Sequence, residues 1–104
     1  MQHTLTMNDN KKTVTVQKGD TIEIELDENM TTGFNWDIDK ADENICELVA
    51  SEYQLPANSA MGGGGVRTMI FRVKNTGTAS IRLKNWQRWS GSIYQNFEVT
   101  VKAS

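Results

Sequence analysis

The sequence has little of what most catalytic and metal-binding sites are built from. Its 104 residues include one cysteine, one histidine and one proline. The single cysteine, Cys46, excludes an intramolecular disulfide and a cysteine-rich zinc site. His3 lies at a terminus that we expect to be mobile, and isolated residues of these two types more often pack or face water than form a base and nucleophile. No P-loop, dinucleotide-binding fingerprint or metal-ligand cluster is present. We therefore expect no enzymatic activity, no cofactor and no metal.

An excess of positive charge and a long apolar run are also missing. Lysine and arginine number 11 against 13 acidic residues, which gives a net charge of -2. A general nucleic-acid binder is normally basic, and a membrane span needs roughly 18 consecutive apolar residues. We expect neither a nucleic-acid nor a membrane partner. The free thiol favours the cytoplasm; the alternative is a mature form whose targeting segment was removed before Met1.

What the sequence does contain is period-two alternation, which is typical of half-buried β-strands. The apolar residues expected to face a core are Leu5, Met7, Val14, Val16, Ile22, Ile24, Leu26, Phe34, Trp36, Ile38, Met69, Phe71, Val73, Ala79, Ile81, Leu83, Phe97, Val99 and Val101. Turn signals separate these runs. We predict one all-β domain over residues 1–104, an antiparallel immunoglobulin-like β-sandwich of about seven to eight strands. Residues 40–48 alternate poorly, and a short helical turn is an alternative there.

Three connections carry more unusual chemistry than a turn requires. They are residues 29–34 (NMTTGF), 60–65 (AMGGGG) and 86–91 (WQRWSG). Each has a simpler interpretation: an ordinary turn in which a hydroxyl bonds its own backbone, a slack glycine linker, or tryptophans that pack in the core, as we expect of Trp36. Alternate connections of a sandwich emerge at the same end, however, so the three segments can form one surface.

Together the three segments resemble the chagasin-type inhibitors of papain-like cysteine peptidases. That family's first loop reads Asn-Pro-Thr-Thr-Gly followed by an aromatic residue, its second Gly-x-Gly-Gly, and its third Arg-Pro-Trp with a nearby glycine. The matching residues are Asn29, Thr31, Thr32, Gly33 and Phe34, then Gly62, Gly64 and Gly65, then Trp89 and Gly91. Order and spacing agree from about Val14 to Val101. Two departures stand out: Met30 replaces the proline that would fix the backbone, and Gln87-Arg88 replaces Arg-Pro.

The resemblance implies an immunoglobulin-like fold and reversible, occlusive inhibition of a papain-like or cathepsin-L-like cysteine peptidase. Three loops would enter the active-site cleft of the enzyme, and we expect the inhibitor to be a monomer. The implied peptidase-binding residues are Asn29, Thr31, Thr32, Gly33, Phe34, Gly62, Gly63, Gly64, Gly65, Arg88, Trp89 and Gly91.

Two alternatives from other functional classes stay open at this point. β-Sandwiches also serve as carbohydrate-binding modules, in which Trp86, Trp89 and Tyr94 would stack on sugar rings. An immunoglobulin-like adhesion or assembly domain would instead self-associate. Because of Met30, residues 29–31 form an N-x-T glycosylation acceptor. A glycan there would sit at the tip of the inhibitory surface, so we expect a chain that does not pass through a eukaryotic secretory route.

Overall fold

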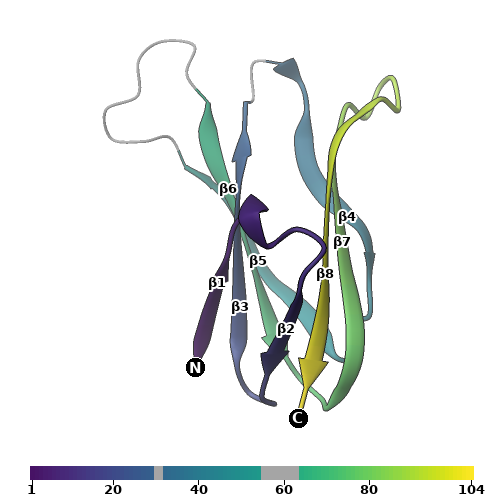
Figure 1. The fold of residues 1–104 in the computed structure, drawn as a ribbon. Coiled ribbons are helices and arrows are strands. Elements are labelled where there is room, and N and C mark those ends of the chain that lie inside the picture. Colours follow the sequence, from purple (N-terminus) through teal and green to yellow (C-terminus); the bar gives the residue numbers. More distant parts are fainter. Residues whose placement is uncertain (30–31, 55–63) are drawn as a thin grey trace.

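The computed structural model describes residues 1–29, 32–54 and 64–104. Two four-stranded sheets face each other across an apolar core (Figure 1). The strands are β1 (Gln2–Leu5), β2 (Thr13–Val16), β3 (Thr21–Glu28), β4 (Asn35–Ala41), β5 (Cys46–Gln54), β6 (Gly65–Val73), β7 (Gly77–Trp86) and β8 (Ile93–Ala103). The prediction of an immunoglobulin-like all-β sandwich is confirmed.

The strand order is β1-β3-β6-β5 in one sheet and β2-β8-β7-β4 in the other. The long strands pair antiparallel, as expected, whereas β1 runs parallel to β3 and β2 runs parallel to β8. The parallel pairs arise because the N-terminal segment leaves one sheet after β1 and joins the other as β2. β1 and β2 therefore each lie at the edge of a sheet, and neither forms a hairpin with the strand next to it in sequence.

Most of the core consists of inward-facing residues that the alternation predicted, with Cys46 and Ala103 in addition. Ile22, Phe71, Ile81 and Phe97 are all 0 % exposed. Met7, Val14 and Ile38 are only partly buried against it. The expectation that Phe34 faces the core is wrong, because its ring packs on Tyr94 instead.

Trp36 is 4 % exposed and donates a hydrogen bond from its indole Nε1 to the carbonyl of Asp27 at 2.8 Å. A buried indole needs such a partner for its N–H group. The expectation that Trp36 belongs to the core is confirmed.

The N-terminal segment is more ordered than the sequence suggested. His3 lies within β1, and its Nε2 is 2.8 Å from Oδ2 of Asp20, so the prediction of a mobile terminus is wrong. Met7 does not extend this strand; it begins a 3-10 helix, Met7–Asp9. Thr6 and Asp9 cap that helix with reciprocal side-chain hydrogen bonds, a local signal for a helix start that outweighs the apolar alternation.

Strand β5 is the element that the sequence left undecided. It begins at Cys46, after one hydrogen-bonded turn in which the carbonyl of Asp42 accepts from Ile45 and Cys46 at 3.1 and 2.9 Å. Residues 40–48 alternate poorly because they span the end of β4, this turn and the first three residues of β5. Alternation is interrupted again further along β5. The pairing of β5 with β6 shifts register between Leu48 and Ala50, and a bulge of this kind moves later side chains to the other face.

The described residues contain no helix long and apolar enough to cross a membrane. Within the same residues, histidine, cysteine and acidic side chains do not gather in groups of three or more that could hold a metal ion.

Candidate functional site

The described residues of the three unusual segments, Asn29, 32–34, 64–65 and 86–91, lie at the same end of the sandwich, where β3, β5 and β7 end and β4, β6 and β8 begin (Figure 1). We call them the first loop (residues 29–34, between β3 and β4), the second loop (55–64, between β5 and β6) and the third loop (87–92, between β7 and β8). Among the predicted site residues, Thr31, Gly62 and Gly63 lie outside the described part of the chain.

The first loop ends in a tight turn that its own side chains hold. The carbonyl of Asn29 accepts hydrogen bonds from the amide and the hydroxyl of Thr32, at 3.3 and 2.8 Å. The Thr32 hydroxyl in turn accepts from the amide of Phe34 at 3.3 Å. Gly33 has a φ of +79°, a backbone region that other residues rarely enter. The Thr-Gly step therefore serves the local backbone, as the simpler interpretation supposed.

The third loop is closed by hydrogen bonds of Gln87 and by a left-handed glycine. The amide of Gln87 donates to the carbonyl of Ser92 at 2.9 Å, and its own carbonyl accepts from Gly91 at 2.8 Å. The hydroxyl of Ser90 donates to Oε1 of Gln87 at 2.8 Å. Gly91 has a φ of +74°, and a Cβ atom there would meet nothing within 4 Å. Gly91 therefore shapes the turn through its backbone.

The first and third loops are in direct contact. Nε2 of Gln87 donates to the carbonyl of Thr32 at 3.0 Å. The indole of Trp89 lies against Gly33, where a Cβ atom would overlap its ring. Trp89 is nevertheless 75 % exposed, so one side of the indole rests on the first loop and the remainder faces solvent. The contact therefore holds a large apolar ring at the tip.

The two described glycines at the end of the second loop have different surroundings. Gly64 is exposed and lies beside the first loop, because a Cβ atom on it would be 3.6 Å from the carbonyl of Glu28 and 4.0 Å from Cβ of Asn29. Gly65 is buried and belongs to β6 rather than to the loop. A Cβ atom there would lie 2.6 Å from the ring of Tyr53, so Gly65 is required for packing.

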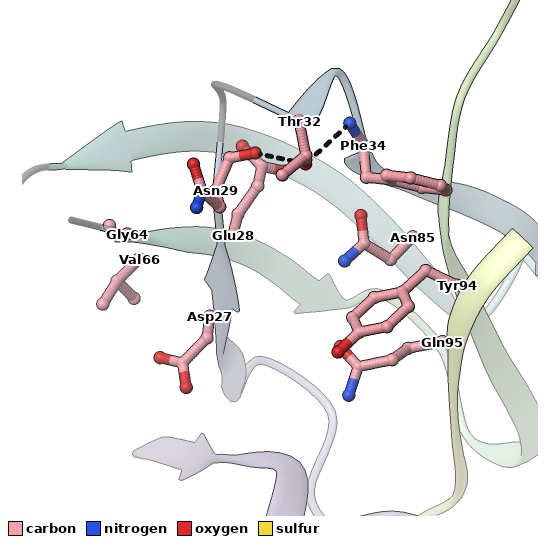
Figure 2. Close-up of a pocket in the computed structure, with 11 residues that line it drawn as sticks. Asp27, Glu28, Asn29, Thr32, Phe34, Gly64, Val66, Asn85, Tyr94 and Gln95 are labelled. Carbon is pink, nitrogen blue, oxygen red and sulfur yellow. Dashed lines mark hydrogen bonds between the residues drawn. The ribbon is translucent and has the colours of Figure 1, made fainter. Parts of the chain in front are cut away.

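A cavity of about 770 Å³ opens between the two sheets beneath the first loop and Gly64. Figure 2 shows Asn85, Tyr94 and Gln95 on one side of it. The rings of Phe34 and Tyr94 lie 5.8 Å apart between centroids, tilted by 53°. Oδ1 of Asn85, a residue only 4 % exposed, has no hydrogen-bond partner within the described residues. The ends of the strands that carry the loops thus border open space rather than close-packed core.

The three rings of the carbohydrate alternative have different surroundings. The ammonium of Lys84 lies 3.8 Å from the ring centroid of Trp86 and covers that face of the ring. Trp89 rests on Gly33, and Tyr94 packs against Phe34. One face of Trp86 is therefore covered, whereas Trp89 and Tyr94 remain 75 % and 69 % exposed, and titration with soluble polysaccharides is the test of the carbohydrate alternative.

Residues 15–101 match the sequence profile described as Chagasin family peptidase inhibitor I42. This match spans most of the chain and all three loops. The protein belongs to the chagasin family. Chagasin of Trypanosoma cruzi is 31 % identical over 110 residues, which cover the whole of both chains.

Solved structures agree with this assignment. A cysteine protease inhibitor of Entamoeba histolytica, EhICP2, superposes with a TM-score of 0.90 at 23 % identity, over 99 % of this chain and 96 % of that one. The solution structure of Amebosin gives a TM-score of 0.84 at 27 % identity, over 100 % and 99 % of the two chains. At 23 % identity the first comparison shows the shared fold alone.

Within the chagasin family's pattern, the third motif is the one that departs most. Gln87 occupies the position of the family's arginine and bonds the first loop through Thr32. Arg88, which we predicted as a site residue, is 3.2 Å from Oδ2 of Asp37 on β4. Sequence analysis missed Gln87 as a site residue, because only its departure from the motif drew attention to it and no local signal indicated a contact with the first loop.

Proposed function

We propose that this protein inhibits papain-like cysteine peptidases reversibly, by placing its three loops in the active-site cleft. The family is one of peptidase inhibitors, and the resemblance of the loop motifs points to papain-type enzymes. The observation that carries the proposal is the meeting of the loops. Thr32, Gly64 and Trp89 come from three separate connections and lie at one end. Gly33 and Gln87 join the first loop to the third, and Gly64 lies beside Glu28 and Asn29 at the start of the first loop.

The first loop would approach the catalytic cysteine and histidine of the enzyme. Thr32 and Gly33 have small side chains or none, and a tight turn allows backbone and hydroxyl groups to come close. The carbonyl of Asn29 and the hydroxyl of Thr32 are already bonded to each other, and that hydroxyl also accepts from Phe34, so these groups would resist rearrangement into a substrate-like strand. Occlusion without cleavage follows.

The second loop would lie extended along the cleft and exchange backbone hydrogen bonds with it, as a substrate strand does. Gly64 is exposed and carries no side chain that would obstruct this approach. Trp89 would be the apolar anchor on the other side of the catalytic centre. Buried tryptophans commonly dominate interface energies, and truncating one costs about 2 kcal/mol or more.

Rigid loops would raise affinity, because ordering a flexible segment on binding costs free energy. The hydrogen bond from Gln87 to Thr32 and the contact of Trp89 with Gly33 reduce that cost. We expect the complex to bury on the order of 1,600 Å² in total, the usual size for a protease and its protein inhibitor.

The test is a set of progress curves of papain and of a cathepsin-L-like enzyme with the protein at nanomolar concentration. We expect inhibition that is relieved on dilution and leaves the chain uncut by mass spectrometry. Tryptophan fluorescence during titration with inactivated papain, and separately with soluble polysaccharides, is the companion measurement. A response to the polysaccharides alone, with both peptidases fully active, would contradict the proposal.

A further inference from the structure

Glu28 is a buried carboxylate directly before the first loop. Its side chain is 0 % exposed, and it lies at the last position of β3. The guanidinium of Arg67 on β6 forms a two-pronged ion pair with it: Nη2 is 2.8 Å from Oε2, and Nε is 3.2 Å from both carboxylate oxygens. A buried ion is costly unless it is well paired. These two residues lie outside all three loops, so the proposed function gives them no role.

The carboxylate of Glu28 also reaches across to the other sheet. Oε1 accepts a hydrogen bond from the amide of Trp36 at 2.6 Å. β3 and β4 belong to different sheets, so no ladder hydrogen bond can join them there. The bond from Trp36 to Glu28 thus closes the base of the first loop, between the strand that enters it and the strand that leaves it.

Arg67 also contacts β5, the strand that enters the second loop, in addition to the ladder that pairs β5 with β6 up to Gln54 and Val66. Its guanidinium carbon lies 5.6 Å from the ring centroid of Tyr53, near the end of β5, and Nη1 is 3.4 Å from the hydroxyl of Ser51. Arg67 and Tyr53 are also register partners in the sheet. The strand that enters the second loop is therefore held by the residue that pairs with Glu28.

Apolar packing is incomplete at the loop end of the sandwich, although the buried indole of Trp36 also joins β4 to β3 there through its bond to the carbonyl of Asp27. Glu28, Asn29, Thr32 and Gly64 all border the 770 Å³ cavity (Figure 2). Strand ends that border open space need another constraint to stay in one geometry, because contacts are missing on that side. The ion pair and its hydrogen bonds provide this constraint.

We propose that the buried Glu28–Arg67 pair is a positioning element that holds the bases of the first and second loops in one geometry, and so sets how tightly the protein inhibits. The inference rests on the proposed function. Neither residue needs to touch the peptidase, since both act through the strand ends from which the loops leave.

The test uses Glu28→Gln, which keeps the shape but leaves the guanidinium without a charged partner, and the double variant Glu28→Leu with Arg67→Met, which removes both charges. Replacing a buried ion pair by apolar residues of similar volume commonly keeps or raises stability. Glu47→Gln is the control for Glu28→Gln. The double variant Glu47→Leu with Arg72→Met is the control for Glu28→Leu with Arg67→Met. That second Glu–Arg pair joins β5 and β6, at 3.1 Å, and its side chains are 40 % and 56 % exposed, whereas Glu28–Arg67 joins β3 and β6.

Three measurements are made on each variant: urea unfolding, hydrogen exchange of the Trp36 amide, and the inhibition constant against papain. For both Glu28 variants we expect the hydrogen-exchange rate of the Trp36 amide and the inhibition constant to rise about tenfold or more. The inhibition constant should rise because lost preorganisation lowers affinity. The control variants should leave both unchanged. The decisive case is the double variant, which should stay as stable as the parent and yet inhibit poorly.

Each outcome bears on the proposal. A double variant that inhibits within about twofold of the parent would overturn the positioning role, and unchanged exchange at Trp36 would overturn the closure of the loop base. Val99→Ala, a core substitution in the other sheet, shows how much inhibition is lost when only the stability of the fold falls. If a Glu28 variant of the same stability as Val99→Ala lost no more inhibition than Val99→Ala does, the proposal would also be overturned. If the parent chain does not inhibit papain, the proposed function fails, while the exchange measurement still decides whether the pair closes the loop base.

Discussion

Gly33 is a position where a side chain is excluded for two independent reasons. Its φ of +79° lies in the left-handed region, and the indole of Trp89 occupies the space that a Cβ atom would need. The family resemblance singled out both residues, in different loops of one expected surface, and it made no prediction about a contact between them. Their meeting gives the glycine a second role, as the support on which the exposed tryptophan rests.

Replacing Trp89 by alanine should raise the inhibition constant against papain at least tenfold, about 1.4 kcal/mol of binding free energy. The physical reason is the loss of the apolar anchor, which is 75 % exposed in the free protein and would be buried in the complex. Val49→Ala is the matched control, because Val49 is also an exposed apolar residue but lies on β5. Equal inhibition by a folded Trp89→Ala variant would remove this anchor from the mechanism.

The thiol of Cys46 should be unreactive in the folded protein. Burial raises its pKa to about 11, and the nearby charge of Asp42 adds to the effect. The thiolate is the reactive form, so a disulfide reagent such as Ellman's at pH 8 should modify the native chain only as fast as it opens. The same reagent should react at once in concentrated urea. Rapid labelling of the native protein would show that Cys46, the first residue of β5, is accessible to the reagent.

At the scale of elements, the sequence predicted strands wherever alternation was regular and failed where it was interrupted. β3 has the burial pattern expected from its alternating residues, and so does β7 over most of its length. β5 lies at a sheet edge, and its pairing shifts between Leu48 and Ala50. A bulge breaks the two-residue period that identifies a strand, so no local pattern could have predicted how β5 pairs with its neighbour.

Gly64 lies in the second loop and Gly65 begins the strand that follows it, β6, and the two neighbours should differ in whether they tolerate a side chain. Gly64→Glu should fold normally, because a Cβ atom there makes only ordinary contacts at 3.6 Å and beyond. It should inhibit papain about tenfold or more weakly, since a long side chain would obstruct strand-like docking. Unfolding in urea and the inhibition constant are the two measurements. Unimpaired inhibition would mean that the glycine run is only a linker.

Gly65→Ala is the contrasting variant for this experiment. Its Cβ atom would lie 2.6 Å from the carbonyl of Gln54 and from the ring of Tyr53, both of which must move. Overpacking of this kind typically costs about 1–3 kcal/mol of stability. A lower urea midpoint is therefore expected for Gly65→Ala and not for Gly64→Glu.

At the scale of the whole molecule, the end opposite the loops is held by charge. Asp20 accepts a hydrogen bond from the amide of Gln17 at 3.0 Å, and it lies 2.8 Å from Nε2 of His3 and 3.1 Å from the amino group of Met1. These partners, His3 first, lower the pKa of Asp20 from 3.8 to about 2. The carboxylate thus ties the parallel N-terminal strand to the start of β3.

The stability of the fold should consequently fall in acid. A carboxyl whose pKa is lower in the folded state stabilises the protein above its unfolded pKa and loses that contribution as the pH falls through the folded value. For Asp20 this window runs from about pH 4 to about pH 2. Urea midpoints measured across it should decline, and Asp20→Asn should be less stable at pH 7 and decline less. If Asp20→Asn showed the same acid dependence as the parent, the loss of stability in acid would come from other carboxylates.

The sequence by itself determined the sandwich and the family, because both depend on local information: side chains that alternate with period two, and short loop motifs in a fixed order. It also indicated that the loops would share one end, which follows from the alternation of connections in any sandwich. Only the tertiary structure decided what joins them. Gln87 meets Thr32 across 55 positions of sequence, and Glu28 meets Arg67 across 39. Contacts between such distant residues depend on how two sheets pack and twist, and no local period encodes them.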